Sequence, residues 1–276
     1  MDARTFYGLE PHGDGRWTLA VVPGLTSGTG ALFGGCGLGA GIEVLEHLTG
    51  RPCVWATAQF LSYARPPAVV ELEAVEVVRG HPISQGRVTA RVDDREILTV
   101  TAALGERPSP FTGQWAIRPS VPGPDDCPPR VMLHQHTGTI SDRLDMRLAD
   151  ARSVLDLPGP PGSGNASMWL RMPELLEMSA ATLAIIGDFV PFGIGQALGR
   201  RAGGNSLDNT LRMVTRVPTE WVLADVRVHA VAEGFGHGLV HLWAEDGTLL
   251  GTASQSTIVR EHRDEPPTEL EGEVRR

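Results

Sequence analysis

The sequence predicts an α+β protein of two similar halves, each with a helix packed on an antiparallel sheet. The first half contains a helix candidate rich in small residues, 34–48, followed by a run of strand candidates. The second half repeats this order, with a helix candidate at 173–188 and a further run of strand candidates. A sheet of that size needs its apolar face covered, and one helix in each half can cover it.

The strand candidates are recognised by alternating polar and apolar residues and by the turns between them. Residues 87–92 alternate as a half-buried strand does. Asp93-Asp94 and Asp246-Gly247 make tight hairpin turns that join neighbouring antiparallel strands. The candidates are 53–63, 69–78, 86–92 and 96–104 in the first half, and 168–171, 206–216, 220–231, 237–244 and 248–260 in the second.

Stretches dense in proline and glycine, 106–129 and 157–164, divide the halves and indicate linkers or surface loops. The last residues are charged, contain a proline pair and have no periodicity, which predicts disorder. We therefore expect an N-terminal domain at 1–115, a linker at 116–164, a C-terminal domain at 165–262 and a disordered tail at 263–276.

Composition excludes several classes of protein. The net charge is −9, from 33 acidic and 24 basic residues, so we expect no nucleic-acid partner, which would need a basic surface. The chain contains no lysine, which excludes a P-loop lysine and Schiff-base chemistry. Any anionic ligand must be held by arginine, by backbone N–H groups or by a helix N-terminus.

The cysteines and the N-terminus predict a cytoplasmic protein. Cys36, Cys53 and Cys127 are odd in number and lack metal-site spacing, which indicates free thiols in a reducing compartment. Residues 1–11 have no signal-peptide pattern, and no run of roughly 18 uncharged apolar residues predicts a membrane span.

Five motifs, occurring in order over residues 8–260, carry a resemblance to a known family. They are Ala31-Leu-Phe-Gly-Gly-Cys-Gly-Leu-Gly-Ala-Gly41, Tyr63-Ala-Arg-Pro66, Ile186-Gly-Asp-Phe-Val-Pro191, Asn205-Ser-Leu-Asp-Asn-Thr210 and Ala253-Ser-Gln-Ser-Thr-Ile-Val-Arg260. They resemble motifs of the acyl-CoA thioesterase II family. The resemblance implies a double hot-dog fold, in which two long helices are each wrapped by a long antiparallel sheet. It also implies hydrolysis of fatty acyl-CoA.

Carried over onto this sequence, the family's hydrolytic residues fall on Asp188, Ser206 and Gln255, all in the second half. Ser206 stands where the family usually has threonine, and both side chains offer a hydroxyl. Asp188 would orient or deprotonate the attacking water, and the other two would hold that water by hydrogen bonds.

Further residues are implied as supports of the site. We expect Gly34, Gly35, Cys36 and Arg65 to contact the substrate or the oxyanion. We expect Asp208 and Asn209 to contact the hydrolytic residues without contacting the substrate. Two of these depart from the family's pattern, since Cys36 replaces a glutamine and Asn209 replaces a histidine. Glu43, on the first helix, is the reserve candidate, because some hot-dog thioesterases use a glutamate there.

We expect acyl-CoA as the partner, no cofactor and no metal. His134-x-His136 has no further metal ligands near it in the sequence, and the glycine repeat from Gly35 to Gly41 lacks the spacing of a dinucleotide loop. That repeat indicates close packing of the helix on a sheet. Exposed strand edges favour a homo-oligomer.

Two alternatives remain open. The first is a non-catalytic hot-dog protein that binds acyl-CoA or another lipid, which the replacements at Cys36 and Asn209 allow. The second is a double hot-dog enoyl-CoA hydratase. Its usual G-D-x-N-P-x-H motif has no counterpart here, since Asp225 and His229 have the wrong spacing.

Overall fold

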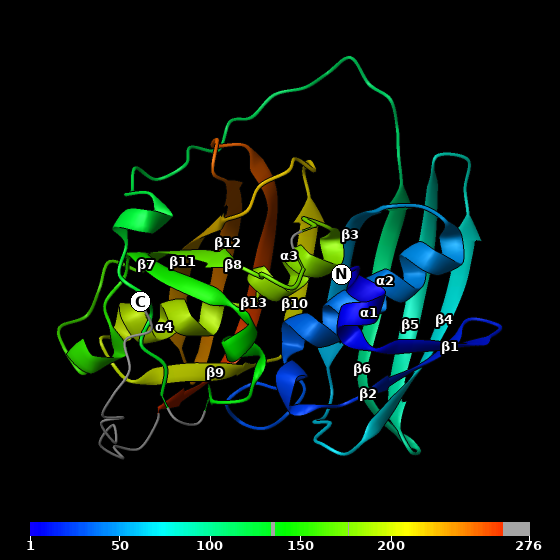
Figure 1. Ribbon diagram of the computed structural model, residues 1–276, viewed down its shortest axis with the longest axis horizontal. Coiled ribbons are helices and arrows are strands. Elements are labelled where there is room, and N and C mark those ends of the chain that lie inside the picture. The colour runs from blue at the N-terminus through cyan, green and yellow to red at the C-terminus, as the bar shows by residue number, and fades with distance from the viewer. Residues whose placement is uncertain (134–135, 176, 262–276) are drawn as a thin grey trace.

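A single antiparallel sheet runs through the whole molecule, with helices packed on one of its faces (Figure 1). The computed structural model describes all residues except 134–135, 176 and 262–276, so the tail predicted at 263–276 lies outside the described residues. The strands are β1 (Leu9–Gly13), β2 (Arg16–Ala20), β3 (Cys53–Phe60), β4 (Val69–Arg79), β5 (Ile83–Val92), β6 (Arg95–Gly105), β7 (Asp145–Asp150), β8 (Asn165–Arg171), β9 (Ala202–Ser206), β10 (Asp208–Met213), β11 (Val222–Ala232), β12 (Phe235–Ala244) and β13 (Leu249–Glu261). The helices are α1 (Ala3–Tyr7), α2 (Gly34–Thr49), α3 (Ala180–Ile186) and α4 (Val190–Leu198), with 3-10 turns η1 (Pro23–Leu25), η2 (Pro124–Asp126), η4 (Ile140–Arg143) and η5 (Val154–Asp156).

The strand order is repeated as a mirror image in the two halves. From the outside inward the first half runs β2-β4-β5-β6-β3, and from the centre outward the second half runs β10-β13-β12-β11-β8. β3 and β10 join the halves as antiparallel neighbours, with Thr57 opposite Thr210 and their hydroxyl groups 2.7 Å apart. The chain therefore uses one pattern of pairing twice, as the order of elements in the sequence predicted.

α2 confirms the helix predicted at 34–48 and explains its glycines. A Cβ at Gly37 would lie 2.7 Å from a methyl carbon of Leu98, and one at Gly41 would lie 2.7 Å from a methyl carbon of Val100. Both partners belong to β6, so close packing of the helix on the sheet is confirmed. Gly39, on another side of α2, lies against the backbone of α3.

The second central helix differs from its prediction. The sequence predicted one helix at 173–188, but α3 begins after Ser179, whose side chain caps it, and ends at Ile186. A second helix, α4, starts at Val190 with Pro191 in its first turn. Proline is favoured in a first turn and unfavourable in a helix interior, so a new helix begins here after a bend at 187–189. The second half thus has two short helices in place of one long helix.

These two helices are core elements. The span Ala180–Leu198 is long and apolar enough to cross a membrane by composition, but 78% of its most apolar stretch is buried inside the protein. α3 contacts α2, and α4 contacts β11, β12 and β13. The span therefore serves as the apolar cover of the second half of the sheet.

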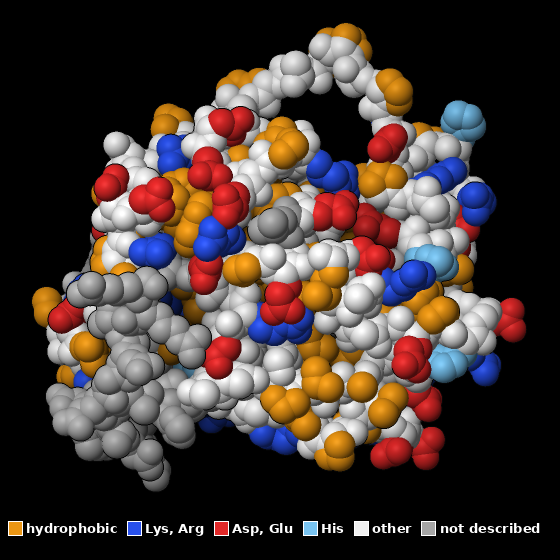
Figure 2. Space-filling model, in the orientation of Figure 1, with side chains coloured by type: hydrophobic (Ala, Val, Ile, Leu, Met, Phe, Trp, Pro, Cys, Tyr) orange, Lys and Arg blue, Asp and Glu red, His pale blue; other side chains and the backbone are white. Residues whose placement is uncertain are grey.

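The segment predicted as a linker packs on one face of the second half and adds a strand at its edge. Ala116 and Val121 cover a cluster on the face opposite the helices that contains Trp169, Leu223 and Trp243. β7, which the sequence did not predict, adds a strand to β8 at the edge of the sheet. On the molecular face drawn in Figure 2, acidic and basic side chains are interspersed.

Candidate active site

Asp188 lies in the bend between α3 and α4 and is almost fully buried, with 6% of its surface exposed. Its Oδ2 atom accepts a hydrogen bond of 2.5 Å from the backbone N–H of Gly35, in the first turn of α2. Its Oδ1 atom accepts a hydrogen bond from the side-chain amide of Gln255. The carboxylate is therefore fixed from both sides, by an element of each half.

Gln255 lies on β13 and connects the site residues. Its Oε1 atom accepts a 3.0 Å hydrogen bond from the N–H of Val190, at the start of α4. This bond fixes the orientation of the amide, so that Nε2 donates to both Asp188 and the Ser206 Oγ atom, the latter at 2.9 Å. Gln255 is 3% exposed, so these bonds have little competition from solvent.

Ser206 is the last residue of β9, opposite Thr257 of β13. The sequence predicted one strand over 206–216, but Leu207 separates β9 from β10. Because the Ser206 oxygen accepts the proton from Gln255, its own hydroxyl proton is available to another acceptor. The structure thus brings Asp188, Ser206 and Gln255 into one hydrogen-bonded group.

Burial raises the pKa of the Asp188 carboxyl to about 7, whereas the hydrogen bonds from Gly35 and Gln255 act to lower it. Burial wins because a buried carboxylate loses its hydration, and the two donors replace only part of it. At neutral pH the carboxyl is therefore divided between its acid and its base form, which suits a group that takes up and returns a proton.

The start of α2 is arranged differently from our expectation for Gly34, Gly35 and Cys36. The Gly35 N–H, expected to face the oxyanion, instead orients Asp188. Gly34 lines the cavity, and a Cβ there would lie 2.8 Å from the Asp188 Oδ2 atom. Cys36 is fully buried, and burial raises the pKa of its thiol. All three cysteines of the chain are free, as predicted.

Arg65, Asp208 and Asn209 lie outside the walls of the cavity. The Arg65 guanidinium donates a 2.5 Å hydrogen bond to the carbonyl oxygen of Thr29, a residue of a loop that lines the cavity. Asp208 accepts a 2.8 Å hydrogen bond from the N–H of Ser256, next to Gln255 on β13. Asn209 is fully buried, and its side-chain amide has no hydrogen-bond partner among the residues that the structure describes.

The structure also shows where Glu43, the reserve candidate, and the two histidines of the His134-x-His136 motif lie relative to the described residues. Glu43 is half-buried on α2, where burial raises its pKa, and it does not line the cavity. His136 lines the cavity, whereas His134 lies outside the described residues. Within the described ranges no cluster of histidine, cysteine, aspartate and glutamate has the geometry to hold a metal ion.

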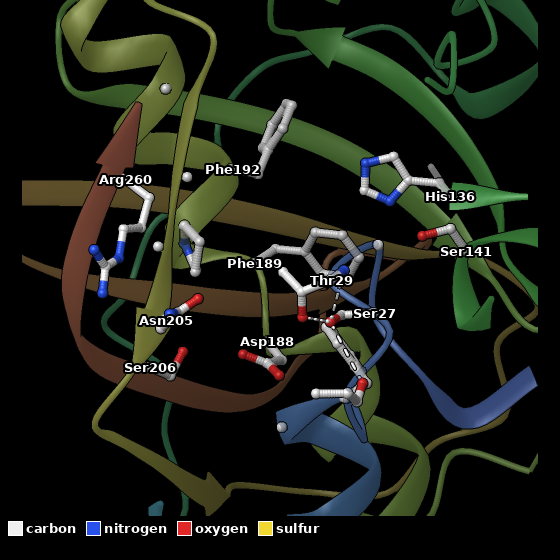
Figure 3. A pocket seen from close by; sticks show the side chains of 18 of the residues that line it. Ser27, Thr29, His136, Ser141, Asp188, Phe189, Phe192, Asn205, Ser206 and Arg260 are labelled. Atoms are coloured by element: carbon white, nitrogen blue, oxygen red, sulfur yellow. Dashed lines mark hydrogen bonds between the residues drawn. The ribbon is translucent and has the colours of Figure 1, made fainter. Parts of the chain in front are cut away.

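The hydrogen-bonded group opens into a cavity of about 500 Å³. In Figure 3, Arg260, Asn205 and Ser206 lie on one side of Asp188, and His136 and Ser141 lie on the other. The sequence analysis did not predict most of the residues that line the cavity, since aromatic residues that line a cavity have the same pattern as aromatic residues of a core. The aromatic and arginine side chains of the wall are Phe33, Phe60, Tyr63, Phe189, Phe192, Arg130, Arg152, Arg200, Arg201 and Arg260.

Comparison with solved structures shows the same fold in other proteins. A hot-dog-fold protein of unknown function from Alicyclobacillus acidocaldarius is 19% identical, with a TM-score of 0.80 over 95% of this chain and 98% of that protein. An acyl-CoA thioesterase II from Mycobacterium marinum is also 19% identical, with a TM-score of 0.73 over 94% of this chain and 98% of that protein. These likenesses show that the chain has a hot-dog fold.

Two further comparisons concern the family. A candidate thioesterase from Novosphingobium aromaticivorans is 33% identical, with a TM-score of 0.81 over 91% of this chain and 97% of that protein. The family model of the acyl-CoA thioesterase C-terminal domain matches residues 124–259, which include Asp188, Ser206 and Gln255. No curated protein matches the chain by sequence. The family model and the 33% identity together show that the chain belongs to the acyl-CoA thioesterase family.

Proposed function

We propose that this protein hydrolyses the thioester of fatty acyl-CoA to free acid and CoA, with a water held by Asp188 and Ser206, which Gln255 positions. One observation carries the assignment of these residues. A buried carboxylate whose pKa is raised to about 7 is hydrogen-bonded, through Gln255, to a hydroxyl at the wall of a cavity. Such a carboxylate can act as a general base at neutral pH.

The proposed reaction has two steps. Asp188 takes a proton from the water while the water oxygen bonds to the thioester carbonyl carbon, which gives a tetrahedral intermediate. The carbon–sulfur bond then breaks, and the CoA sulfur leaves with the proton returned by Asp188. The Ser206 hydroxyl donates a hydrogen bond to the water oxygen and fixes the line of attack of the water.

The intermediate carries a negative oxygen that needs donors. The Gly35 N–H is engaged by Asp188, so we assign the oxyanion to the remaining positive end of α2, beginning at Gly34. Gly34 lines the cavity and has no side chain that would keep the carbonyl away. A helix N-terminus stabilises such an anion by its N–H groups and its dipole.

We also propose that the protein is a double hot-dog protein, with the catalytic residues in a C-terminal domain at 165–262. The mirrored strand order supports this assignment, and so does the packing of α2 on one half and of α3 and α4 on the other. The expected domain at 1–115 would supply Gly34 and Gly35, and the linker at 116–164 would supply walls of the cavity such as Ile140. The cytoplasmic location and the homo-oligomer stay predictions.

The test is a thiol-release assay on acyl-CoAs of varied length, using the wild type and Asp188→Asn. We expect turnover by the wild type and loss of at least about a thousandfold in kcat in Asp188→Asn, since the amide cannot accept the proton. Asp125→Asn, at an exposed position of η2, is the matched control and should keep full activity.

Three results would contradict the proposal. Full activity of Asp188→Asn would remove Asp188 from the mechanism. Tight binding of acyl-CoA by the wild type without thiol release would favour the non-catalytic binding protein. Hydration of an enoyl-CoA without thiol release would favour the hydratase.

A further inference from the structure

Arg130 is a cavity residue that the proposed reaction does not use. Its backbone N–H donates a 2.9 Å hydrogen bond to the carbonyl oxygen of Met146, which holds it beside β7. Its side chain extends toward α4, where the guanidinium carbon lies 4.8 Å from the ring centre of Phe192 and 5.9 Å from that of Phe189. Phe189 follows Asp188 directly in the chain, and Arg130 and Asp188 line the same cavity.

Among the residues that the structure describes, no carboxylate balances the charge of Arg130. The one hydrogen bond of its guanidinium within the described part of the chain goes to the Met146 Sδ atom at 3.3 Å, a weak acceptor. Burial lowers the pKa of Arg130 to about 10, which still leaves it charged at neutral pH. By contrast, Arg143 pairs with Glu174 and Arg171 pairs with Asp145.

Most of the N–H groups of Arg130 are available to a ligand, because the side chain is half-buried and lines the cavity. The guanidinium has five N–H donors, and within the described part of the chain only Nη1 has a hydrogen-bond acceptor, the Met146 thioether. An incoming carboxylate suits the remaining donors, because its two oxygens match the fork of the guanidinium in a charge-assisted pair. The aromatic rings hold the guanidinium in place and lower the entropy lost when that pair forms.

We propose that Arg130 is a specificity-determining residue that binds a carboxylate carried by the acyl group of the substrate. The preferred substrates would then be CoA thioesters of dicarboxylic acids, with the thioester at Asp188 and the free carboxylate at Arg130. This inference rests on the proposed thioesterase activity, but it concerns the acyl group that the cavity selects.

The CoA phosphates are the other source of anionic oxygen, and the distribution of charge argues against them here. Arg200 and Arg260 also line the cavity and are exposed, so they can bind phosphates that stay hydrated. Figure 3 places Arg260 beside Asn205 and Ser206, whereas Arg130 lies against the apolar rings of Phe189 and Phe192. A doubly charged phosphate group is poorly suited to that apolar wall, and a single carboxylate suits it better.

The test compares pairs of substrates that differ only in the terminal group. We would measure kcat/KM for adipoyl-CoA against hexanoyl-CoA, and suberoyl-CoA against octanoyl-CoA, in the wild type, Arg130→Met and Arg130→Lys. Methionine keeps an unbranched apolar side chain without the guanidinium group, and lysine keeps the charge without the fork. In at least one pair we expect kcat/KM of the wild type to be about tenfold or more higher for the dicarboxylic thioester than for its monocarboxylic partner. Arg130→Met should lose that preference, and Arg130→Lys should retain part of it.

Three outcomes would overturn the inference. The first is a wild type that prefers the monocarboxylic member of both pairs. The second is an equal loss of kcat/KM for both members of a pair in Arg130→Met. The third is weaker inhibition of Arg130→Met than of the wild type by free CoA. The last two would assign Arg130 to folding or to the CoA phosphates, and thermal unfolding of both variants separates these. If no thioester is hydrolysed, the proposed function fails, and calorimetric binding of the same pairs to the wild type and Arg130→Met still tests the carboxylate preference.

Discussion

The Asp188 Oδ2 atom accepts a hydrogen bond from the Gly35 N–H, although the two residues are 153 positions apart in the sequence. Gly35 lies in the first turn of α2 and Asp188 lies between α3 and α4, so the bond joins the central helices of the two halves. The positive end of α2 favours the charged form of the carboxyl, yet burial outweighs it and the pKa is raised to about 7. The fold thus determines both the position and the protonation of the proposed base.

The first prediction concerns the pH dependence of the reaction. Asp188 must be deprotonated to act as a base, and burial raises its pKa to about 7. We therefore expect kcat/KM to rise about tenfold per pH unit below 7 and to level off above it. Steady-state rates between about pH 5 and 9, with the assay thiol reagent tested separately at each pH, provide the measurement. A profile that is already level at the acid end of this range would contradict a raised pKa.

The Asp188 carboxyl should make the protein less stable as the pH rises, over the same range in which its deprotonation raises the activity. The folded-state pKa of about 7 lies above the ordinary value of 3.8, so the folded state binds the proton more tightly than the unfolded chain. The contribution of Asp188 is therefore fully present below about pH 4 and is lost as the pH rises through 7. Urea unfolding should show Asp188→Asn gaining stability relative to the wild type over this range, by on the order of a few kcal/mol. An unchanged difference between the two proteins would contradict this prediction.

The next prediction separates a positioning role of Gln255 from a purely structural one. In Gln255→Glu the new carboxylate can still accept from the Val190 N–H, but it loses the donor to Asp188 and adds a like charge beside it. We expect the inflection of kcat/KM to move to higher pH, because both changes favour the protonated form of Asp188. Gln255→Met, which removes the donor without adding charge, should lower kcat and shift the inflection less. An inflection that stays in place in Gln255→Glu would mean that Gln255 has no electrostatic influence on the base.

Ser206 is expected to act through its hydroxyl alone. Its oxygen accepts a 2.9 Å hydrogen bond from Gln255, which leaves the hydroxyl proton for the water. Ser206→Ala should therefore lower kcat by about ten- to a hundredfold, the cost of one hydrogen bond to a polar group in a buried site. Ser206→Thr keeps the hydroxyl and should retain activity within a few-fold. Equal activity of the alanine and threonine variants would show that the hydroxyl takes no part.

Local patterns predicted the sheet and α2 because alternation, hairpin turns and a run of small residues are properties of neighbouring positions. The helix candidate ended at 188 and a loop was expected after it, so α4 was not predicted, because Pro191 is also compatible with a loop. The site residues came from motifs, but the engagement of Gly35 by Asp188 depends on the approach of two helices. Arg130 had no signal, since nothing in the sequence distinguishes an unpaired cavity arginine from one on the surface.

The last prediction tests the helix contact that supports the site. A Cβ at Gly39 would lie 2.8 Å from the carbonyl oxygen of Ala181 and would overlap the hydroxyl of Tyr7, which itself donates a 3.0 Å hydrogen bond to that carbonyl. Alanine is favoured over glycine within a helix by about 1 kcal/mol, so propensity alone predicts that Gly39→Ala stabilises α2. Overpacking of a buried contact costs about 1–3 kcal/mol, and here it also disturbs the Tyr7 hydrogen bond.

We therefore expect a net loss of about 1–2 kcal/mol in the free energy of unfolding of Gly39→Ala, measured by urea denaturation. Gly123→Ala is the matched control, because φ there is −65° and a Cβ would meet no atom within 4 Å. It should unfold at the wild-type urea concentration or slightly above it. Since α3 leads directly into Asp188, Gly39→Ala should also lower kcat, whereas a variant more stable than the wild type would show that α2 and α3 can move apart at little cost.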